Sequence, residues 1–257
     1  MRYAAGVRSA VCIMAMCLAA PTASAQSSGQ LWSNITVDWL QSDRLTLTLD
    51  VEPKVVVQAP AGRPGWTNVD VSPSLAFTLA SWVDATAEVV TGYTRSEDGD
   101  GVVEATTRVG FQLEILSRLL AAAAGHDGAD RERPPRRRLV IGSLIRAEFR
   151  NRFAVNGATI SDRRLRERIE LAFPINRRRM TADRTLYGTA DGELFVPMND
   201  AAGWFVNQYR IRAGIGYRYD FNWRFEALLI RTQARETAAN SFSASAIALD
   251  LRIKRAF

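Results

Sequence analysis

The fold is indicated most clearly by residues 209–219, which read Tyr-Arg-Ile-Arg-Ala-Gly-Ile-Gly-Tyr-Arg-Tyr. Apolar or aromatic side chains occupy the odd positions, and arginine or glycine occupies the even ones. Successive side chains of a β-strand point to opposite faces, so a period of two predicts a strand with one apolar and one polar face. A helix does not produce this pattern. The same alternation recurs at residues 45–57 and 249–254.

Applied along the whole chain, the alternation predicts a series of strands joined by turns rich in Gly, Pro, Asn and Asp. The predicted strands span residues 30–40, 44–57, 68–80, 83–94, 102–116, 138–153, 160–174, 185–196, 205–219, 223–233 and 242–257. Residues 121–138 are predicted to form a loop. Bacterial single-chain barrels normally have an even number of strands and both termini in the periplasm. We therefore expect an all-β, closed antiparallel transmembrane barrel of 10 or 12 strands, with one strand misassigned near residues 112–137.

The N-terminus has the features of a secretory signal. Arg2 and Arg8 precede an uncharged apolar run at residues 11–20, and Ala23 and Ala25 occupy the A-x-A positions of a cleavage site. The run is about half the roughly 20 residues that a transmembrane helix needs. We predict that residues 1–25 are a signal peptide and that residues 26–257 form the barrel domain. Both cysteines of the chain lie in the predicted signal, so the mature domain has no thiol.

Charge is distributed unevenly along the chain, whose formal net charge is +6. Residues 26–130 contain 6 basic and 14 acidic residues, and residues 131–257 contain 25 basic and 13 acidic residues. Basic segments can bind nucleic acid. Here, however, the basic residues mostly alternate with apolar ones, which indicates one polar face of a sheet. We therefore predict no nucleic-acid partner.

Alternation alone does not say which face of the barrel is inside. Many predicted strands reach the roughly 9–11 residues that a tilted strand needs to cross the hydrocarbon. The chain also ends on an alternating strand capped by Phe257, which resembles the C-terminal signal read by the bacterial barrel-assembly machinery, although Arg255 interrupts its apolar face. The tryptophans lie near predicted strand ends, where an interfacial belt would place them: Trp32, Trp39, Trp66, Trp82, Trp204 and Trp223.

These features predict insertion in the Gram-negative outer membrane, with outer-membrane lipid and the barrel-assembly machinery as partners. The alternative is a soluble periplasmic or secreted β-barrel that binds an apolar ligand in its interior. The two classes have similar sequences but opposite faces inside.

Several short segments resemble an uncharacterised family of proteobacterial outer-membrane barrels known as domain of unknown function 2490. They are Arg146-Ala147-Glu148-Phe149-Arg150, Glu193-Leu194-Phe195, residues 209–217, Pro73-Ser74-Leu75 and Gly92-Tyr93. The family has no established reaction, so the resemblance implies fold and location only. The insert at 121–138 departs from the family pattern.

The sequence offers little for catalysis. The only histidine, His126, lies in the predicted loop, whereas a hydrolase needs a histidine held against a nucleophile. The sequence has no His or Cys cluster for zinc and no Gly-rich phosphate loop. The acidic residues at 97–100 are interpreted as a solvated loop tip rather than a calcium site. We predict no enzyme activity and no catalytic, cofactor or metal site.

The candidate functional residues are the charges on the polar face of the C-terminal half. They are Arg146, Glu148, Arg150, Arg152, Arg166, Arg168, Glu170, Glu193, Arg210, Arg212 and Arg218. They could form a ring that attracts small anionic solutes into a pore, as charged rings do in channels. They could equally pair with carboxylates and fill the interior. Both interpretations remain open from the sequence, and the predicted role is structural or passive small-solute transport.

Overall fold

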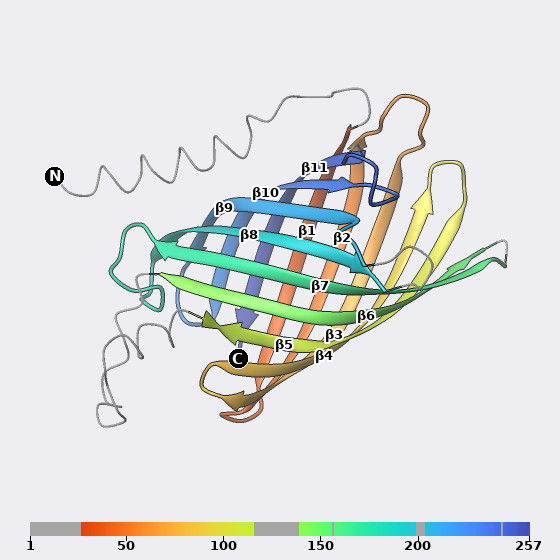
Figure 1. The fold of residues 1–257 in the computed structure, drawn as a ribbon. Coiled ribbons are helices and arrows are strands. Elements are labelled where there is room, and N and C mark those ends of the chain that lie inside the picture. The colour runs from red at the N-terminus through yellow and green to blue at the C-terminus, as the bar shows by residue number, and fades with distance from the viewer. Residues whose placement is uncertain (1–26, 116–138, 156, 199–203, 243) are drawn as a thin grey trace.

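The chain folds into a closed β-barrel, which we describe from a computed structural model covering residues 27–115, 139–155, 157–198, 204–242 and 244–257 (Figure 1). The strands are β1 Ser27–Leu40, β2 Leu45–Gln58, β3 Trp66–Ala80, β4 Val83–Ser96, β5 Gly101–Glu114, β6 Val140–Ala154, β7 Thr159–Pro174, β8 Thr185–Pro197, β9 Gln208–Arg218, β10 Trp223–Ala234 and β11 Ala244–Ala256. Each strand pairs with its neighbour in sequence, and β11 pairs with β1 to close the sheet. The predicted signal peptide, the insert at 121–138 and His126 lie outside the described residues.

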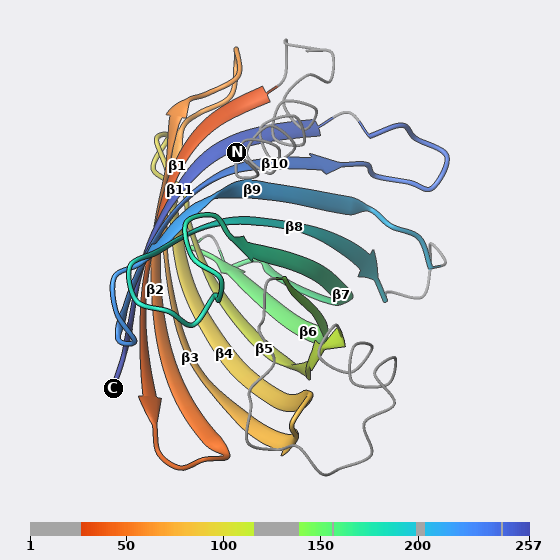
Figure 2. The same ribbon diagram turned by 90° about the vertical axis from the view of Figure 1, so that its left-hand side faces the viewer.

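The described residues form eleven strands, so the expected count of 10 or 12 is wrong. Sequence neighbours pair antiparallel, but β1 and β11 run parallel from Ser27↔Ser245 to Asp38↔Ala256. An odd number of antiparallel steps brings the last strand into the same direction as the first, so the closing pair must be parallel. The eleven spans predicted from alternation are therefore confirmed as strands, whereas the expectation of an even strand number is wrong. Figure 2 shows β1 and β11 side by side.

The odd strand count places the first and last described strand ends at opposite ends of the barrel. Leu40, at the end of β1, donates its backbone N–H to the carbonyl of Phe257, so the C-terminus lies beside the β1–β2 turn. We call this the C-terminal end; it also carries the β7–β8 turn at residues 175–184 and the β9–β10 turn at residues 219–222. Ser27 begins β1 at the other end, which we call the opposite end. The expectation that both termini share one side does not hold for the described strands.

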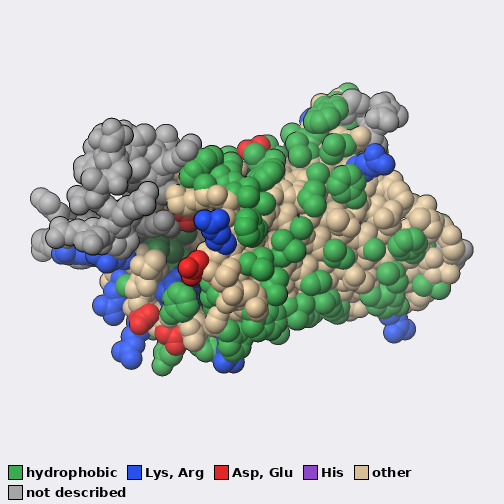
Figure 3. All heavy atoms as spheres, turned by 90° about the horizontal axis from the view of Figure 1, so that it is seen from below, with side chains coloured by type: hydrophobic (Ala, Val, Ile, Leu, Met, Phe, Trp, Pro, Cys, Tyr) green, Lys and Arg blue, Asp and Glu red, His purple; other side chains and the backbone are tan. Residues whose placement is uncertain are grey.

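The apolar face of the alternation points outward. Exposed large hydrophobic side chains occur on every strand, among them Ile35, Phe77, Phe111 and Leu249. Figure 3 shows hydrophobic side chains over the barrel wall, with charged side chains gathered mainly toward one end of the view. The inner face carries the charged partners of the alternation, and several of these are fully buried. The barrel is therefore apolar outside and charged inside.

Three aromatic side chains border the C-terminal end on the outer face. Trp39 stacks on Phe257 with ring centroids 6.4 Å apart. The guanidinium of Arg255 lies 4.2 Å from the Phe257 ring centroid and 4.9 Å from that of Trp223. Cation–π contact of this kind gives the outward arginine partners that need no carboxylate. It explains how the final strand accommodates a charge on its apolar face.

Trp32 does not lie in an interfacial position, which corrects the expectation for this residue. It occupies an even position of β1 and is therefore on the inner face, 7% exposed and packed with Ile230 and Ala248. The strand begins at Ser27, so Trp32 is well inside the strand instead of at its end.

Among the described residues, no helix is long and apolar enough to cross a membrane.

Candidate functional site

The inner face of β6 to β9 is dense in arginine because β6, β7 and β9 each place three arginines at inward positions. We call the following nine residues the basic wall: Arg146, Arg150, Arg152, Arg164, Arg166, Arg168, Arg210, Arg212 and Arg218. Strand register sets two of them, Arg146 and Arg166, directly opposite each other. Like charges directly opposite one another are destabilising. The wall therefore needs carboxylates between its arginines.

Glu148 supplies one of these carboxylates and has no exposed surface. Its oxygens lie 3.0 Å from Arg146, 2.5 Å from Arg164, 3.3 Å from Arg166 and 3.4 Å from Arg108. These arginines come from β5, β6 and β7, so one carboxylate links three strands.

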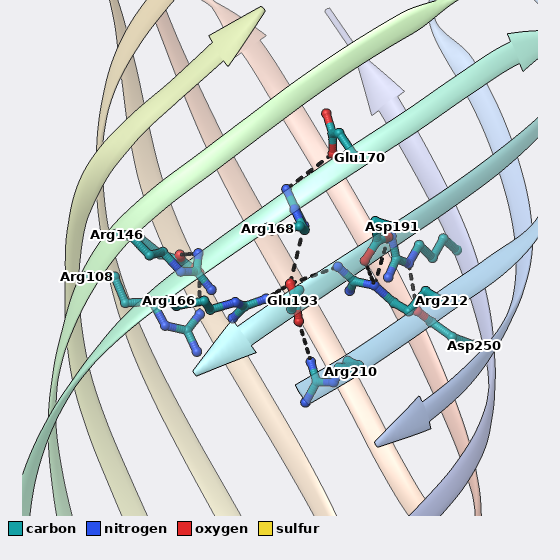
Figure 4. A network of polar contacts seen from close by, with 12 residues as sticks. Arg108, Arg146, Arg166, Arg168, Glu170, Asp191, Glu193, Arg210, Arg212 and Asp250 are labelled. Atoms are coloured by element: carbon teal, nitrogen blue, oxygen red, sulfur yellow. Dashed lines mark hydrogen bonds and ion pairs between the residues drawn. The ribbon is translucent and has the colours of Figure 1, made fainter. Parts of the chain in front are cut away.

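Glu193 has the same role on β8 and is 1% exposed. Arg210 and Arg212 lie 3.3 Å and 2.9 Å from it, Arg168 lies 3.9 Å away, and Arg166 also contacts it. Figure 4 shows these side chains converging on Glu193. Because Arg166 contacts both glutamates, the two clusters form one network from β5 to β9. Buried charges that are paired and hydrogen-bonded in this way avoid most of the cost of leaving water.

The strands of the N-terminal half carry the opposite charge. We call their inward carboxylates the acidic wall: Asp38, Asp50, Glu52, Asp70, Glu88 and Glu104. Glu88 lies 2.9 Å from both Arg108 and Arg146, and Glu104 lies 2.9 Å from Arg150. The boundary between the walls is therefore closed by ion pairs. The uneven charge of the two sequence halves becomes a lumen with one acidic side and one basic side.

A cavity of about 1280 Å³ occupies the lumen and is lined by residues from all eleven strands. Its lining includes Met180 in the β7–β8 turn at the C-terminal end and Trp66 at the opposite end. Inside the lumen, Trp32 of β1 meets Arg210 of β9, whose guanidinium lies 5.1 Å from the ring centroid. These strands are not neighbours in the sheet, so this contact crosses the lumen.

The glycines of β9 make room for a side chain from β8. The register places Tyr187 beside Gly216 and Gly216 beside Glu226 of β10. A Cβ at position 216 would overlap the Tyr187 ring. The ring passes over this glycine, and its hydroxyl donates a 2.7 Å hydrogen bond to Glu226. The second glycine of the Gly-x-Gly-Tyr segment is thus explained by close packing.

All eleven candidate residues predicted from the sequence lie on the inner face of β6 to β9. Glu148 and Glu193 are covered by arginines, whereas Arg210, Arg212 and Arg218 line the cavity. Sequence analysis did not include Arg164 and Asp191 among the candidates, although both lie on the same strand face as the candidates next to them. It also missed Arg108, Trp32 and Phe195, whose contacts with the network depend on register and closure. Phe195 lies beneath Arg164, Arg166 and Arg210, with centroid distances of 4.7, 5.1 and 5.5 Å.

Within the described ranges, no group of three or more His, Cys, Asp or Glu side chains is arranged to hold a metal ion. The network instead consists of arginine–carboxylate pairs that border the lumen cavity. Such an arrangement can bind and orient charged solutes, and it can also hold the barrel shape.

Residues 29–243 match a family described as a protein of unknown function, DUF2490. The chain belongs to this family. The match covers most of the barrel and agrees with the resemblance noted in the sequence, and the family is uncharacterised. No curated protein matches the chain. Among solved structures, the chain is similar to a NanC porin at 9% identity and a TM-score of 0.42, over 88% of this chain and 98% of the porin chain.

Proposed function

We propose that this family member spans the Gram-negative outer membrane and provides a narrow, charged passage for small hydrophilic solutes. The observation that carries the proposal is an apolar exterior combined with a charged cavity whose lining residues include some at each end of the barrel. A passive passage requires no catalytic group.

The exterior supports membrane insertion. Burying apolar surface is favourable by roughly 25 cal/mol per Å². The side chains of Ile35, Ile215 and Leu251 are each 45–50% exposed on the outer face, and similar residues surround the barrel. Monomeric soluble proteins rarely expose continuous apolar patches of more than a few hundred Å². In a bilayer this belt would contact lipid, and the closed sheet would leave no unpaired strand edge.

The interior supports a hydrophilic passage. The cavity is bordered by arginines on one side and by carboxylates such as Asp50 and Glu52 on the other. Rings and walls of charged side chains select permeating ions in channels. A barrel of this strand number lies between side-chain-filled barrels of about eight strands and open porins of 16–18 strands. We therefore propose a passage for small solutes only.

The soluble alternative fits the geometry less well. A barrel that binds an apolar ligand needs apolar side chains inside, as lipocalin-type barrels have. Here the apolar residues on the inner face, such as Trp32, Phe195 and Ile230, are packed among charges.

Two experiments test the proposal. Cells that express the full chain are fractionated, and the protein is run on gels with and without boiling; we expect recovery in the outer-membrane fraction and a heat-dependent shift in mobility. Recovery in the soluble fraction without a shift would contradict membrane insertion. The purified protein is then added to a planar bilayer, where we expect discrete conductance steps. A silent bilayer at high protein load would contradict the passage and leave a structural role.

A further inference from the structure

A second cationic site lies inside the C-terminal end of the lumen, apart from the Glu148–Glu193 network. Arg218 of β9 and Arg224 of β10 are cross-strand partners, and both line the cavity. Arg218 is only 8% exposed. Lys254 of β11 is the next residue in the same row, opposite Arg224. Three cationic side chains therefore follow one another across three strands.

The side chains of Arg218 and Arg224 form no hydrogen bond or ion pair with any described residue. Asp183 in the β7–β8 turn and Asp220 attract Arg218 over a longer distance but form no ion pair with it. Asp220 and Glu226 already have other partners. Asp220 accepts hydrogen bonds of 2.8 Å from the backbone amides of Asn222 and Trp223. Glu226 accepts from Tyr187 and lies 3.8 Å from Arg252, and Lys254 is paired with Asp38 at 2.8 Å.

The contrast with the central network makes this pair informative. Arg146 and Arg166 are also cross-strand partners, but Glu148 lies between them at 3.0 and 3.3 Å. Arg218 and Arg224 have the same relation, but no described carboxylate lies within ion-pair distance of either. Directly opposed like charges destabilise a sheet, and a largely buried charge without a counter-charge is costly. Both costs fall if an anion occupies the cavity beside the pair.

We propose that Arg218 and Arg224 form an anion-binding subsite for the carboxylate or phosphate group of a small solute. A guanidinium presents its N–H groups in a planar fork that binds carboxylate or phosphate through two parallel hydrogen bonds. Two adjacent guanidiniums can therefore hold one anionic group from two sides. The substrate class is small organic or inorganic anions. The physiological role of this subsite rests on the proposed passage, but anion binding can be measured without conduction.

The test is equilibrium binding to the protein purified in detergent from cells that express the full chain. The probes are inorganic phosphate and malonate, each titrated by calorimetry at constant ionic strength. The variants are Arg218→Gln and Arg224→Gln. The matched control is Arg178→Gln, which removes the same charge from the exposed β7–β8 turn at the same end and does not line the cavity.

We expect saturable binding of at least one probe to the wild type. Each lumen variant should weaken it about tenfold or more, and the control should weaken it less than about twofold. Without anion, the lumen variants should be as resistant to urea as the wild type or more so, because a like-charge contact is removed. This readout excludes a purely structural role for the two arginines. Phosphate binding alone, or malonate binding alone, would assign the chemistry of the anion.

Two results would overturn the subsite: neither probe binds, or Arg178→Gln weakens binding as much as Arg218→Gln. Binding with a silent planar bilayer would support the subsite while contradicting the passage. Conductance without binding of either probe would support the passage while contradicting the subsite. Failure of the subsite and failure of the proposed function are therefore distinguishable.

Discussion

The basic wall and the acidic wall face the same lumen, but their charges are held in different ways. On the basic wall, Glu148 and Glu193 are each surrounded by four arginines, and Arg166 joins the two clusters. On the acidic wall, each carboxylate has at most two cationic partners among the described residues. Asp38 pairs with Lys254 alone, and Asp50 has only a 2.5 Å hydrogen bond from the Thr36 hydroxyl.

This difference separates two roles of lumen charge. Carboxylates that cross-link several arginines hold strands together, so their loss leaves several buried positive charges without compensation. Carboxylates with one cationic partner or none keep more of their charge available to the cavity. We expect substitutions on the basic wall to change stability most and substitutions on the acidic wall to change ion selectivity most.

The largest effect is expected for Glu193→Gln. The change leaves Arg166, Arg210 and Arg212 with one fewer buried counter-charge, and breaking a buried pair typically costs about 3–5 kcal/mol. Urea unfolding in lipid vesicles measures the loss. The control is Glu167→Gln, which removes an exposed glutamate from the outer face of β7 and should not destabilise the barrel. Equal destabilisation by both variants would contradict the role assigned to the basic wall.

A smaller effect is expected for Gly216→Ala. The added Cβ overlaps the Tyr187 ring and forces it away from Glu226. Overpacking of this kind costs about 1–3 kcal/mol. Gly192→Ala is the matched control on β8, because a Cβ there meets no atom within 4 Å. The packing explanation fails if the two alanines have the same effect on the urea midpoint.

The double variant Glu148→Gln, Glu193→Gln tests whether the two clusters form one network. Arg166 keeps one glutamate in each single variant and loses both in the double. The double variant should therefore be less stable than the sum of the singles by about 0.5–3 kcal/mol, the usual range for coupled neighbours. Additive losses would show that the clusters are independent.

The smallest effect on stability is expected on the acidic wall, for Asp50→Asn. The amide can still accept the Thr36 hydrogen bond, so we expect a loss below about 1 kcal/mol. Because Asp50 lines the cavity, the reversal potential in a salt gradient should shift toward anion preference. A large loss of stability without a change in selectivity would reverse the assignment of roles to the two walls.

Alternation predicted the strands because each one has a clear apolar face, and all eleven predicted spans coincide with observed strands to within a few residues. The expected strand count is wrong because this barrel has an odd number of strands, unlike most bacterial single-chain barrels. The parallel β1–β11 closure depends on contacts between the two ends of the chain, and no local pattern encodes it. Alternation also could not show which face of the sheet points outward, because soluble and membrane barrels share the same period of two.

The candidate site was predicted as a set of charges and not as a network. Parity along each strand identified Arg166 and Arg168, and it could also have identified Arg164. The partners required register: Arg108 meets Glu148 only because β5 and β6 align these residues. The contact of Trp32 with Arg210 required barrel closure, since β1 and β9 are distant in sequence. The unpaired state of Arg218 and Arg224 required knowledge of every neighbouring carboxylate.

The most direct test of the central claim compares two adjacent positions of β1. Asn34 lines the cavity, and Ile35 is 50% exposed on the outer face. Single cysteines are introduced at each position in a Cys12→Ala, Cys17→Ala background, and the proteins are treated in lipid vesicles with a charged, membrane-impermeant methanethiosulfonate. Asn34→Cys should react and lose conductance in a planar bilayer, whereas Ile35→Cys should remain unmodified. Equal labelling of both positions would contradict a lipid-facing exterior, and failure of Asn34→Cys to react would contradict a water-filled lumen.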